Sequence, residues 1–438
     1  MGVLSGVVDT DRRVIVLALA RMVGAAGNSF LIVVLPLYIA SDLIDIESLL
    51  GTAVGVGAAS VTLTEPLLIG LVLSLFGFLN SLSQPLTGRL SDRTGVRRPF
   101  VLAGIALLGT ASGLYTVADA YWQLIALRAA QGLGAALIIP ATVALVNEYA
   151  ASDADRGGNF GVYNTFRLIG FGFGPVLAGA VVERGPYDLS AVGLPVLDGF
   201  DAAFVAACAG AYLSFALVFL LVRDAAESSE ASDDLSIRVR GEGRLLDPVF
   251  ALGLATVAMG ICIALFATLQ NQVNVRLDQP PVWFGLQFGA VTVANVLFQV
   301  PIGQASDRIG RRPFLLAGFV LLAPTTLLQG IVTDPVIMTL VRLGQGIAVA
   351  CVFAPSLALA GDLAREGESG TTLSVLTMGF GFGVAIGPLA SGWLVGFGFV
   401  VPFAVGAALA VVALACVATQ VEETLGADEG VADAAAAD

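Results

Sequence analysis

Apolar residues run along this chain in long stretches that short polar segments separate. A helix needs about 20 apolar residues to cross a hydrocarbon core of ~30 Å, because it rises ~1.5 Å per residue. Such stretches occur in both halves of the chain, and each is long enough to span a membrane. They are residues 14–39, 66–87, 99–118, 122–146, 160–182, 200–222, 248–269, 282–303, 313–332, 335–360, 371–395 and 400–421. The pattern therefore predicts an all-α membrane protein with twelve transmembrane helices.

A basic motif occurs twice between these stretches. The first basic motif, residues 88–100, reads Gly-Arg-Leu-Ser-Asp-Arg-Thr-Gly-Val-Arg-Arg-Pro-Phe, and the second, residues 303–314, reads Gly-Gln-Ala-Ser-Asp-Arg-Ile-Gly-Arg-Arg-Pro-Phe. We expect both to be short loops. Further matched pairs lie 214 or 215 residues apart: Asn80 and Asn295, Gln84 and Gln299, Arg128 and Arg342, Gln131 and Gln345, Glu148 and Asp362. A repeat of this length predicts two pseudo-symmetric six-helix bundles.

The polar segments divide the chain into four parts. Residues 1–222 form the predicted N-terminal bundle and 247–421 the C-terminal bundle. Residues 223–246 are charged and serine-rich, which predicts a solvated cytoplasmic linker, and 422–438 form an acidic disordered tail. Residues 40–65 leave two alternatives open. This glycine- and alanine-rich segment either extends a neighbouring helix or forms an ordered external loop.

The placement of arginine predicts the orientation. One set of connecting segments holds most of the arginines outside the spans, and the opposite set holds only Arg184 and Arg276. By the positive-inside rule the arginine-rich side is cytoplasmic, so we expect a multi-pass plasma-membrane protein with both termini in the cytoplasm. The arginines of the cytoplasmic set are Arg12, Arg13, Arg89, Arg93, Arg97, Arg98, Arg156, Arg308, Arg311, Arg312 and Arg365, with those of the linker.

Composition agrees with a membrane protein and narrows its partners. Of 438 residues, 57% are hydrophobic and 13% are charged, and the mean hydropathy is +0.89. The net charge of -13 argues against nucleic acid as a partner. All 21 basic residues are arginine, and such acidity without lysine resembles proteins of salt-loving archaea, or halophiles. The four cysteines have no paired spacing, so we expect no disulfide, no metal site and no cofactor.

The two basic motifs resemble the loop between the second and third helices of the major facilitator superfamily. In the first motif Val96 interrupts the arginine run. The resemblance covers nearly the whole chain and implies the major facilitator fold, alternating access and, we expect, a monomer in a lipid bilayer. The matching residues are Gly88, Leu90, Asp92, Arg93, Gly95, Arg97 and Arg98 in the first motif, and Gly303, Asp307, Arg308, Gly310, Arg311 and Arg312 in the second.

The motifs predict a cytoplasmic gate. The fifth and eleventh helices begin on the cytoplasmic side, where their positive dipole ends attract carboxylates. Asp92 would bind the N-terminus of the eleventh helix and Asp307 that of the fifth, so the two contacts would close the cytoplasmic face symmetrically. Glu148 and Asp362 end their helices on the same side, where they can pair with the arginines at 93 and 97 and at 308 and 311. The alternative is that the arginines only set the topology and the carboxylates are only solvated. We favour the gate, because topology does not require the same residue order twice.

Arginines also lie about two turns inside four of the spans. These are Arg21, Arg128, Arg167 and Arg342. An arginine in a membrane costs at least ~2.5 kcal/mol, which makes it a candidate functional residue, although one at this depth can also reach toward the headgroups. Arg128 and Arg342 stand in a repeated Arg-x-x-Gln-Gly setting that resembles a coupling or packing motif of the family. With Arg21, Asn28, Gln131 and Gln345 they are our candidates for the substrate cavity and for coupling.

The fifth and eleventh spans are rich in glycine. The order Gly170, Gly174, Pro175 and Gly179 resembles the signature of the drug/proton-antiporter branch, with Ala178 as a departure. Glycines four apart allow close helix packing, and a proline bends the helix. The eleventh span carries Gly383, Gly387 and Pro388. A packing face is expected in any case, and the resemblance adds the expectation of export.

These features predict a secondary-active transporter for small amphipathic molecules. No Asp or Glu lies in the core of a span, so the candidates for coupling to a proton or sodium ion are Glu148, Asp362, Glu65 and Asp42. The alternative on the same fold is uptake of an organic anion or a sugar. A non-transporting membrane sensor is the alternative from another class. An enzyme is not expected, because no nucleophile-and-base constellation is visible, and no loop typical of ATP binding occurs.

Overall fold

The computed structural model describes residues 11–56, 59–150, 153–190, 193, 195–224, 240, 245–363 and 369–423, without the side chains of 56, 59, 153–157 and 369–374. Twelve helices of the described chain are long and apolar enough to cross a membrane, which confirms the predicted number of spans. They are α2 (Arg12–Ile39), α3 (Glu65–Thr94), α4 (Arg98–Leu114), α5 (Tyr121–Glu148), α6 (Asp153–Arg184), α7 (Gly199–Leu221), α8 (Pro248–Thr268), α10 (Pro281–Ile309), α11 (Arg311–Gln329), α12 (Pro335–Leu363), α13 (Ser369–Leu394) and α14 (Val401–Gln420).

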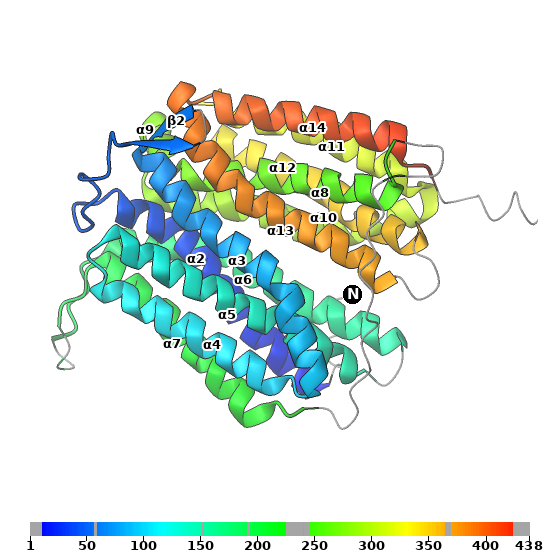
Figure 1. Ribbon diagram of the computed structural model, residues 1–438, viewed down its shortest axis with the longest axis horizontal. Helices are drawn as coiled ribbons and strands as arrows, with labels where there is room; N and C mark the ends of the chain where they lie inside the picture. Colours follow the sequence, from blue (N-terminus) through cyan, green and yellow to red (C-terminus); the bar gives the residue numbers. More distant parts are fainter. Residues whose placement is uncertain are drawn as a thin grey trace, which may run out of the picture. The chain divides into compact units, whose positions relative to one another are not determined.

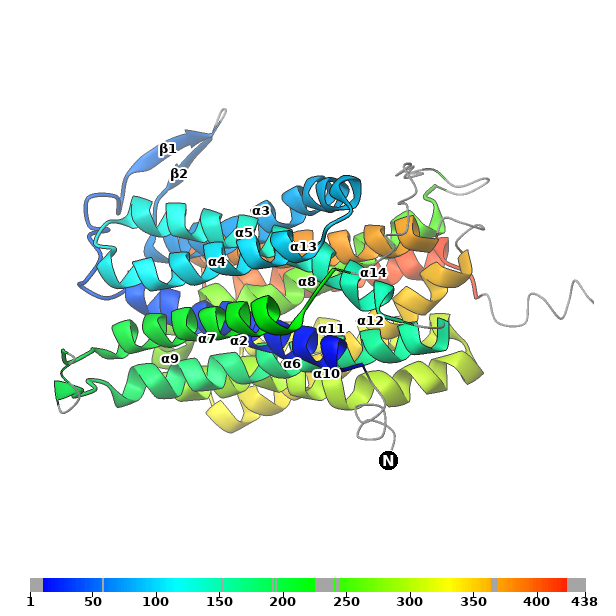
Figure 2. The ribbon, with the colours of Figure 1, turned by 90° about the horizontal axis from the view of Figure 1, so that it is seen from below.

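Short elements complete the fold. The 3-10 turns η1 (Tyr115–Val117) and η3 (Val395–Phe397) follow α4 and α13, and the helix α9 (Gln270–Leu277) follows α8. In the segment left open by the sequence, β1 (Ala53–Val56) pairs with β2 (Ala59–Thr62) as an antiparallel hairpin. The hairpin projects beyond the start of α3 (Figure 2). The segment is therefore an ordered loop rather than an extension of a helix.

The expectation that both basic motifs are loops is wrong. Helix α3 continues through Thr94, and α10 continues through Ile309, so most of each motif is helical. The chain turns at Gly95, whose φ of 66° ends α3 in the left-handed region, and at Gly310, whose φ is 115°. Glycine adopts these angles without strain, whereas the preceding Asp and Arg residues are compatible with a helix. The sharp turn thus needs one glycine in each motif.

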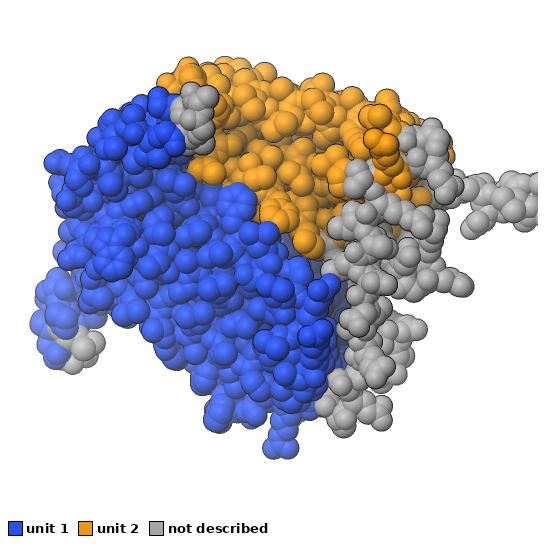
Figure 3. Space-filling view, viewed as in Figure 1, with its two compact units in different colours: residues 1–232, 267–292 blue, residues 233–266, 293–438 orange. Residues whose placement is uncertain are grey.

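The chain divides into two compact units (Figure 3). Unit 1 contains residues 1–232 and 267–292, and unit 2 contains residues 233–266 and 293–438. This division follows the contacts rather than the order of the chain. The helices α8 and α10 both contribute to both units, whereas the sequence predicts that each six-helix bundle is continuous. The bundle boundaries at 222 and 247 remain a prediction, and most of the linker and tail lies outside the described residues.

Each unit has its own apolar core. In unit 1, α2 packs against α6 and α7, while α4 packs against α5 and α7 (Figure 1). Buried residues such as Leu17, Ile105 and Leu145 form the core between these helices. In unit 2, α11 packs against α12 and α14, and the core includes Phe319 and Val352. Inside a bilayer the lipid tails are as apolar as these side chains, so close van der Waals packing rather than removal from water holds each set of helices together.

Candidate functional site

The first basic motif forms an ion-pair cluster around Arg97. Its Nη1 lies 2.6 Å from Oδ1 of Asp92, and its Nε lies 3.2 Å from Oε1 of Glu148, the last residue of α5. Nη1 also donates a hydrogen bond to Oγ of Ser91 at 3.2 Å. The Arg97 side chain is 3% exposed and that of Asp92 is 33% exposed. One buried cation therefore joins carboxylates from two helices of unit 1.

The second basic motif repeats this arrangement in unit 2. Arg311 forms an ion pair with Asp362, near the end of α12. Its Nη2 also lies 3.6 Å from Oδ1 of Asp307 on the last turn of α10, but Asp307 is 59% exposed, so that contact is weak. Arg97 and Arg311 thus have the same role in their units. Each holds one carboxylate of its own motif and one at the end of the second span after that motif.

Two arginines of the predicted gate have no part in these clusters. Arg93 and Arg308 are exposed, and among the described residues neither forms an ion pair. The expectation that they share Glu148 and Asp362 with their neighbours is therefore wrong. Both lie on the last helical turn before the glycine. Contacts of Asp92 and Asp307 with the other half of the chain stay a prediction.

Sequence reasoning missed two acidic residues that hold the motifs in place. Oδ1 of Asp224 accepts hydrogen bonds from the backbone N–H groups of Arg97 and Arg98, at 2.6 and 2.7 Å. In unit 2, Glu423 accepts from the N–H groups of Arg311 and Arg312, at 3.1 and 2.9 Å. These carboxylates cap the N-termini of α4 and α11, where the helix dipole favours negative charge. The available signal was an acidic residue directly after the sixth and the twelfth span.

The next arginine in each motif, Arg98 or Arg312, binds the end of another helix in the same unit. Arg98 donates to the carbonyl of Phe219, near the end of α7, and Arg312 donates to the carbonyl of Ala418 at 2.6 Å, near the end of α14. Each arginine thus satisfies a carbonyl in the last turn of a helix, where no further N–H is available. The contact ties the start of α4 to α7 and the start of α11 to α14.

Tyr149 closes the same end of unit 1. Its hydroxyl donates to the carbonyl of Arg223, and the guanidinium of Arg13 lies 4.3 Å from the centre of its ring. Burial raises the pKa of the Tyr149 phenol above its usual value, so the hydroxyl stays protonated and keeps donating at neutral pH.

Arg128 lies in a buried polar network in the interior of unit 1. Its Nη1 donates to Oε1 of Gln131 at 3.1 Å and to Oδ1 of Asn28 at 3.5 Å. Its guanidinium lies 4.5 Å from the ring centre of Phe76, which provides a cation–π contact. Nε2 of Gln131 donates to Oγ of Ser112 at 2.9 Å. The structure therefore brings Arg128, Gln131 and Asn28 together, as expected, and surrounds the charge with neutral groups.

Arg342 has the corresponding place in unit 2. Its Nη1 donates to Oε1 of Gln345 at 2.6 Å and to Oε1 of Gln329 at 3.2 Å. Its guanidinium lies 4.4 Å from the ring centre of Phe266. Nε2 of Gln345 donates to Oγ1 of Thr326 at 3.3 Å. Burial of Arg342 is complete, at 0% exposure.

The two networks share partners that sequence reasoning missed. Ser112 in unit 1 and Thr326 in unit 2 accept a hydrogen bond from Gln131 and Gln345, respectively. Tyr115 donates to Gln131 at 3.4 Å, and it corresponds in the repeat to Gln329. Each pair is separated by the 214 residues that separate Arg128 from Arg342. The same offset was the signal that could have found them. Their types differ between the halves, so a search for identical residues passes over them.

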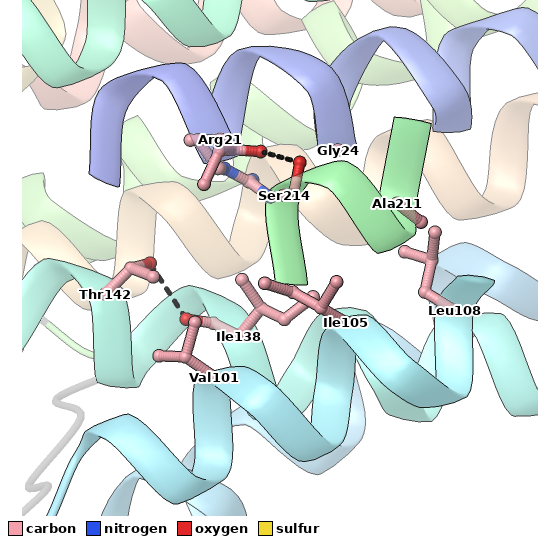
Figure 4. A pocket seen from close by; sticks show the side chains of 10 residues that line it. Arg21, Gly24, Val101, Ile105, Leu108, Ile138, Thr142, Ala211 and Ser214 are labelled. Atoms are coloured by element: carbon pink, nitrogen blue, oxygen red, sulfur yellow. Dashed lines mark hydrogen bonds between the residues drawn. The ribbon is translucent and has the colours of Figure 1, made fainter. Parts of the chain in front are cut away.

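Arg21 and Arg167 are two further arginines inside the spans of unit 1, and both are partly buried. Arg21, on α2, lines a small pocket of unit 1 in which the other lining side chains are uncharged, such as Ile105 and Ile138 (Figure 4). Arg167, on α6, donates from Nε and Nη2 to Oδ1 of Asn164 at 3.0 and 2.9 Å. Both arginines are partly shielded by the surrounding helices.

The predicted packing glycines lie where backbones meet. A Cβ on Gly170 would collide with the carbonyl oxygen of Met22 on α2, and one on Gly179 would lie 2.8 Å from Cα of Val282 on α10. Pro175 lies inside α6 and Pro388 inside α13. The remaining glycines of the set, Gly174, Gly383 and Gly387, also have too little room for a Cβ, against α2 or α8. Gly88 and Gly303 are not crowded in this way.

Comparison with known proteins places this architecture in a family. The family model of the Major Facilitator Superfamily matches residues 17–271 and 248–434. The chain is 27% identical to the MFS-type transporter ppzB of Metarhizium rileyi over 183 residues, which are 41% of this chain and 38% of that protein. It is 26% identical to the class D tetracycline resistance protein of Salmonella ordonez over 291 residues, 64% of this chain and 68% of that protein. The match therefore spans less than half the length of ppzB.

A solved structure has the same fold. It is that of a bacterial homologue of the human lysosomal transporter Spinster, in an inward-facing and occupied conformation. The two chains share 14% sequence identity with a TM-score of 0.70, and the alignment covers 93% of this chain and 94% of that one. The family model spans both halves of the repeat, twelve helices can cross a membrane, and the fold is that of a solved transporter. This chain therefore belongs to the major facilitator superfamily.

Proposed function

We propose that this protein is a secondary-active transporter that works by alternating access and exports small amphipathic molecules. It acts as a monomer in the plasma membrane, with both termini in the cytoplasm. The observation that carries export is the glycine face of α6, which has the spacing of the drug/proton-antiporter branch. That face packs against two backbones, since Gly170 lies against α2 and Gly179 lies against α10. The name of the tetracycline resistance relative is consistent with export.

The gate proposal follows from the two ion-pair clusters. Arg97 and Arg311 each bind a carboxylate at the end of a span, Glu148 or Asp362. Protonation of such a carboxylate would weaken its bond to the arginine and free the start of the next helix to move. Glu148 is 9% exposed, so it can be reached by a proton without being fully solvated. Glu148 and Asp362 are therefore our candidates for coupling, with a proton or a sodium ion as the coupling ion.

Flux in reconstituted vesicles tests this function. A panel of neutral and anionic amphipathic compounds is offered under imposed pH and Na⁺ gradients, and empty vesicles provide the background. We expect gradient-dependent flux of at least one compound. In Glu148→Gln we expect exchange of that compound to persist while uphill transport driven by the pH gradient is lost. The matched control is Glu183→Gln, which changes an exposed carboxylate at the C-terminal end of α6.

Absence of gradient-dependent flux for every compound would contradict transport and favour a membrane sensor. Uphill transport that is unchanged in Glu148→Gln would leave export standing and remove that carboxylate from the coupling mechanism.

The second candidate is uptake of an organic anion. It is favoured by the buried arginines of unit 1, whose described partners are neutral side chains. Right-side-out and inside-out vesicles distinguish the two directions, because export accumulates the compound only in the inside-out preparation.

A further inference from the structure

Two arginines of unit 1 lie close together inside the membrane-spanning helices. Arg21 is on α2 and Arg167 is on α6, and each lies within three residues of the point where the two helices touch. The helices approach closely here, because a Cβ on Gly170, one turn after Arg167, would collide with the backbone carbonyl of Met22. Two cations on helices that approach this closely repel each other.

No carboxylate of the described chain forms an ion pair with either arginine. Arg167 donates to the neutral amide oxygen of Asn164. Nε of Arg21 is buried and has no hydrogen-bond partner. An arginine inside a membrane is costly and usually pairs with another group, and a buried donor without a partner adds to the cost. The two arginines therefore have no anionic partner among the described residues.

The surroundings of these charges combine hydroxyl groups with apolar surface. Thr142 lines the same pocket as Arg21, and its Oγ1 lies 2.6 Å from Oη of Tyr163, which in turn interacts electrostatically with Arg167. Ile105 and Ile138 line the pocket beside Arg21 (Figure 4), whereas Arg167 is not among the residues that line it. A ligand that fits this environment has a compact anionic group attached to an apolar body.

We propose that Arg21 and Arg167 together bind the anionic group of the transported molecule, an amphipathic organic carboxylate or sulfonate. This inference rests on the proposed transport function and names the substrate class. The planar guanidinium groups offer paired N–H donors that match the oxygens of such a group. Binding removes the repulsion between the two cations, so the site favours an anion over a neutral molecule of the same shape. A lipid phosphate has the same chemistry, and the experiment separates it from a substrate.

Binding to the full chain in nanodiscs of phosphatidylcholine tests the proposal. The probes are 8-anilinonaphthalene-1-sulfonate and the neutral N-phenyl-1-naphthylamine, which share an aromatic body and differ by the sulfonate. We expect saturable binding of the sulfonate above the signal of empty discs. Arg21→Gln and Arg167→Gln should each weaken it at least about tenfold, because a hydrogen bond to a charged group is lost, and leave the neutral probe unaffected. The control Arg184→Gln, an exposed residue at the end of α6, should bind both probes normally.

A second measurement uses the wild-type protein, so it does not depend on the folding of a variant. Phenylglyoxal modifies accessible arginines, and mass spectrometry gives the rate at Arg21 with Arg184 as the internal reference. The sulfonate should slow modification of Arg21, whereas the neutral probe should not. The measurement is repeated with phosphatidylglycerol in the disc. If that lipid alone protects Arg21 and displaces the sulfonate, the site binds headgroups and the proposal is overturned.

Sulfonate binding that is absent, or that is unchanged in both glutamine variants, also overturns the proposal. These outcomes are distinct from failure of the transport function, in which no compound shows gradient-dependent flux. Flux of neutral compounds that persists in Arg21→Gln, together with sulfonate binding equal to wild type, would retain the transporter and reject the anion site.

Discussion

Single residues decide how each basic motif is held. One arginine, the buried Arg97 or the partly buried Arg311, links the motif to the end of a span, and one acidic residue, Asp224 or Glu423, caps the helix that follows. Opposite charges that are buried together depend on each other, because removal of one leaves the other desolvated and unpaired. The neighbouring exposed arginines have no such dependence.

Substitution of Arg97 by Gln tests this difference. We expect the free energy of unfolding to fall by about 3 kcal/mol, since Glu148 loses its buried partner. The matched control Arg93→Gln changes an exposed arginine of the same motif and should alter the free energy by less than about 0.5 kcal/mol. Thermal or denaturant unfolding in detergent measures both. Equal losses for the two variants would mean that the ion pair contributes nothing beyond the general basic character of the motif.

At the scale of helices, close packing in unit 1 depends on glycine. The α6 glycines lie against α2 on one side and α10 on the other, and α10 contributes Gly285 and Gly289 to the same contact. Gly285 has no space for a side chain, because a Cβ there would meet the backbone carbonyl of Pro175. A backbone atom cannot turn aside as a side chain can, so the helices themselves would have to move.

A substitution on α10 tests that contact. In a chain without its native cysteines, cysteines at Gly172 and Thr292 should form a disulfide on oxidation, since a Cβ built at Gly172 would lie 3.3 Å from Cβ of Thr292. We expect Gly285→Ala to reduce the rate of crosslinking, measured by gel electrophoresis, at least about tenfold as the helices separate. Gly303→Ala on the same helix, where nothing lies within 4 Å, provides the control. An unchanged rate in Gly285→Ala would show that the helices do not need this close approach.

At the scale of the whole molecule, charge predicts which face is cytoplasmic. Each basic motif begins in the last turns of a span, and the hairpin of β1 and β2 precedes α3, whose other end carries the first basic motif. A membrane-spanning α3 therefore places the hairpin and Asp92 on opposite sides. The arginine bias assigns the motif side to the cytoplasm.

Labelling of single cysteines in intact cells checks the orientation. An impermeant maleimide should modify Ser60→Cys, which is exposed in β2, from the outside. Arg308→Cys, exposed at the end of α10, should react only after the membrane is made permeable. Both variants are built in a chain whose four native cysteines are replaced. The reverse pattern would place the termini outside and contradict the proposed cytoplasmic gate.

Much of the architecture was predictable because the bilayer imposes it. Runs of about 20 apolar residues identify spans whatever their partners, and the repeated spacing of Arg128 and Arg342 reveals two related halves. Helix ends were less predictable. The turn at Gly95 could not be distinguished from a longer loop, because the Asp and Arg residues before it are polar in either case and are compatible with a helix outside the apolar core.

The sequence by itself determined the twelve spans, the internal repeat and the family, since each follows from the length, order and spacing of residues. Only the tertiary structure decided which of several similar residues matter. It selected Arg97 over Arg93, revealed Asp224 and Glu423 as caps, and brought the helix of Arg21 against the helix of Arg167. The physical reason is that ion pairs, caps and uncompensated charges depend on burial and distance between segments far apart in the chain. Hydropathy and local spacing carry no information about either.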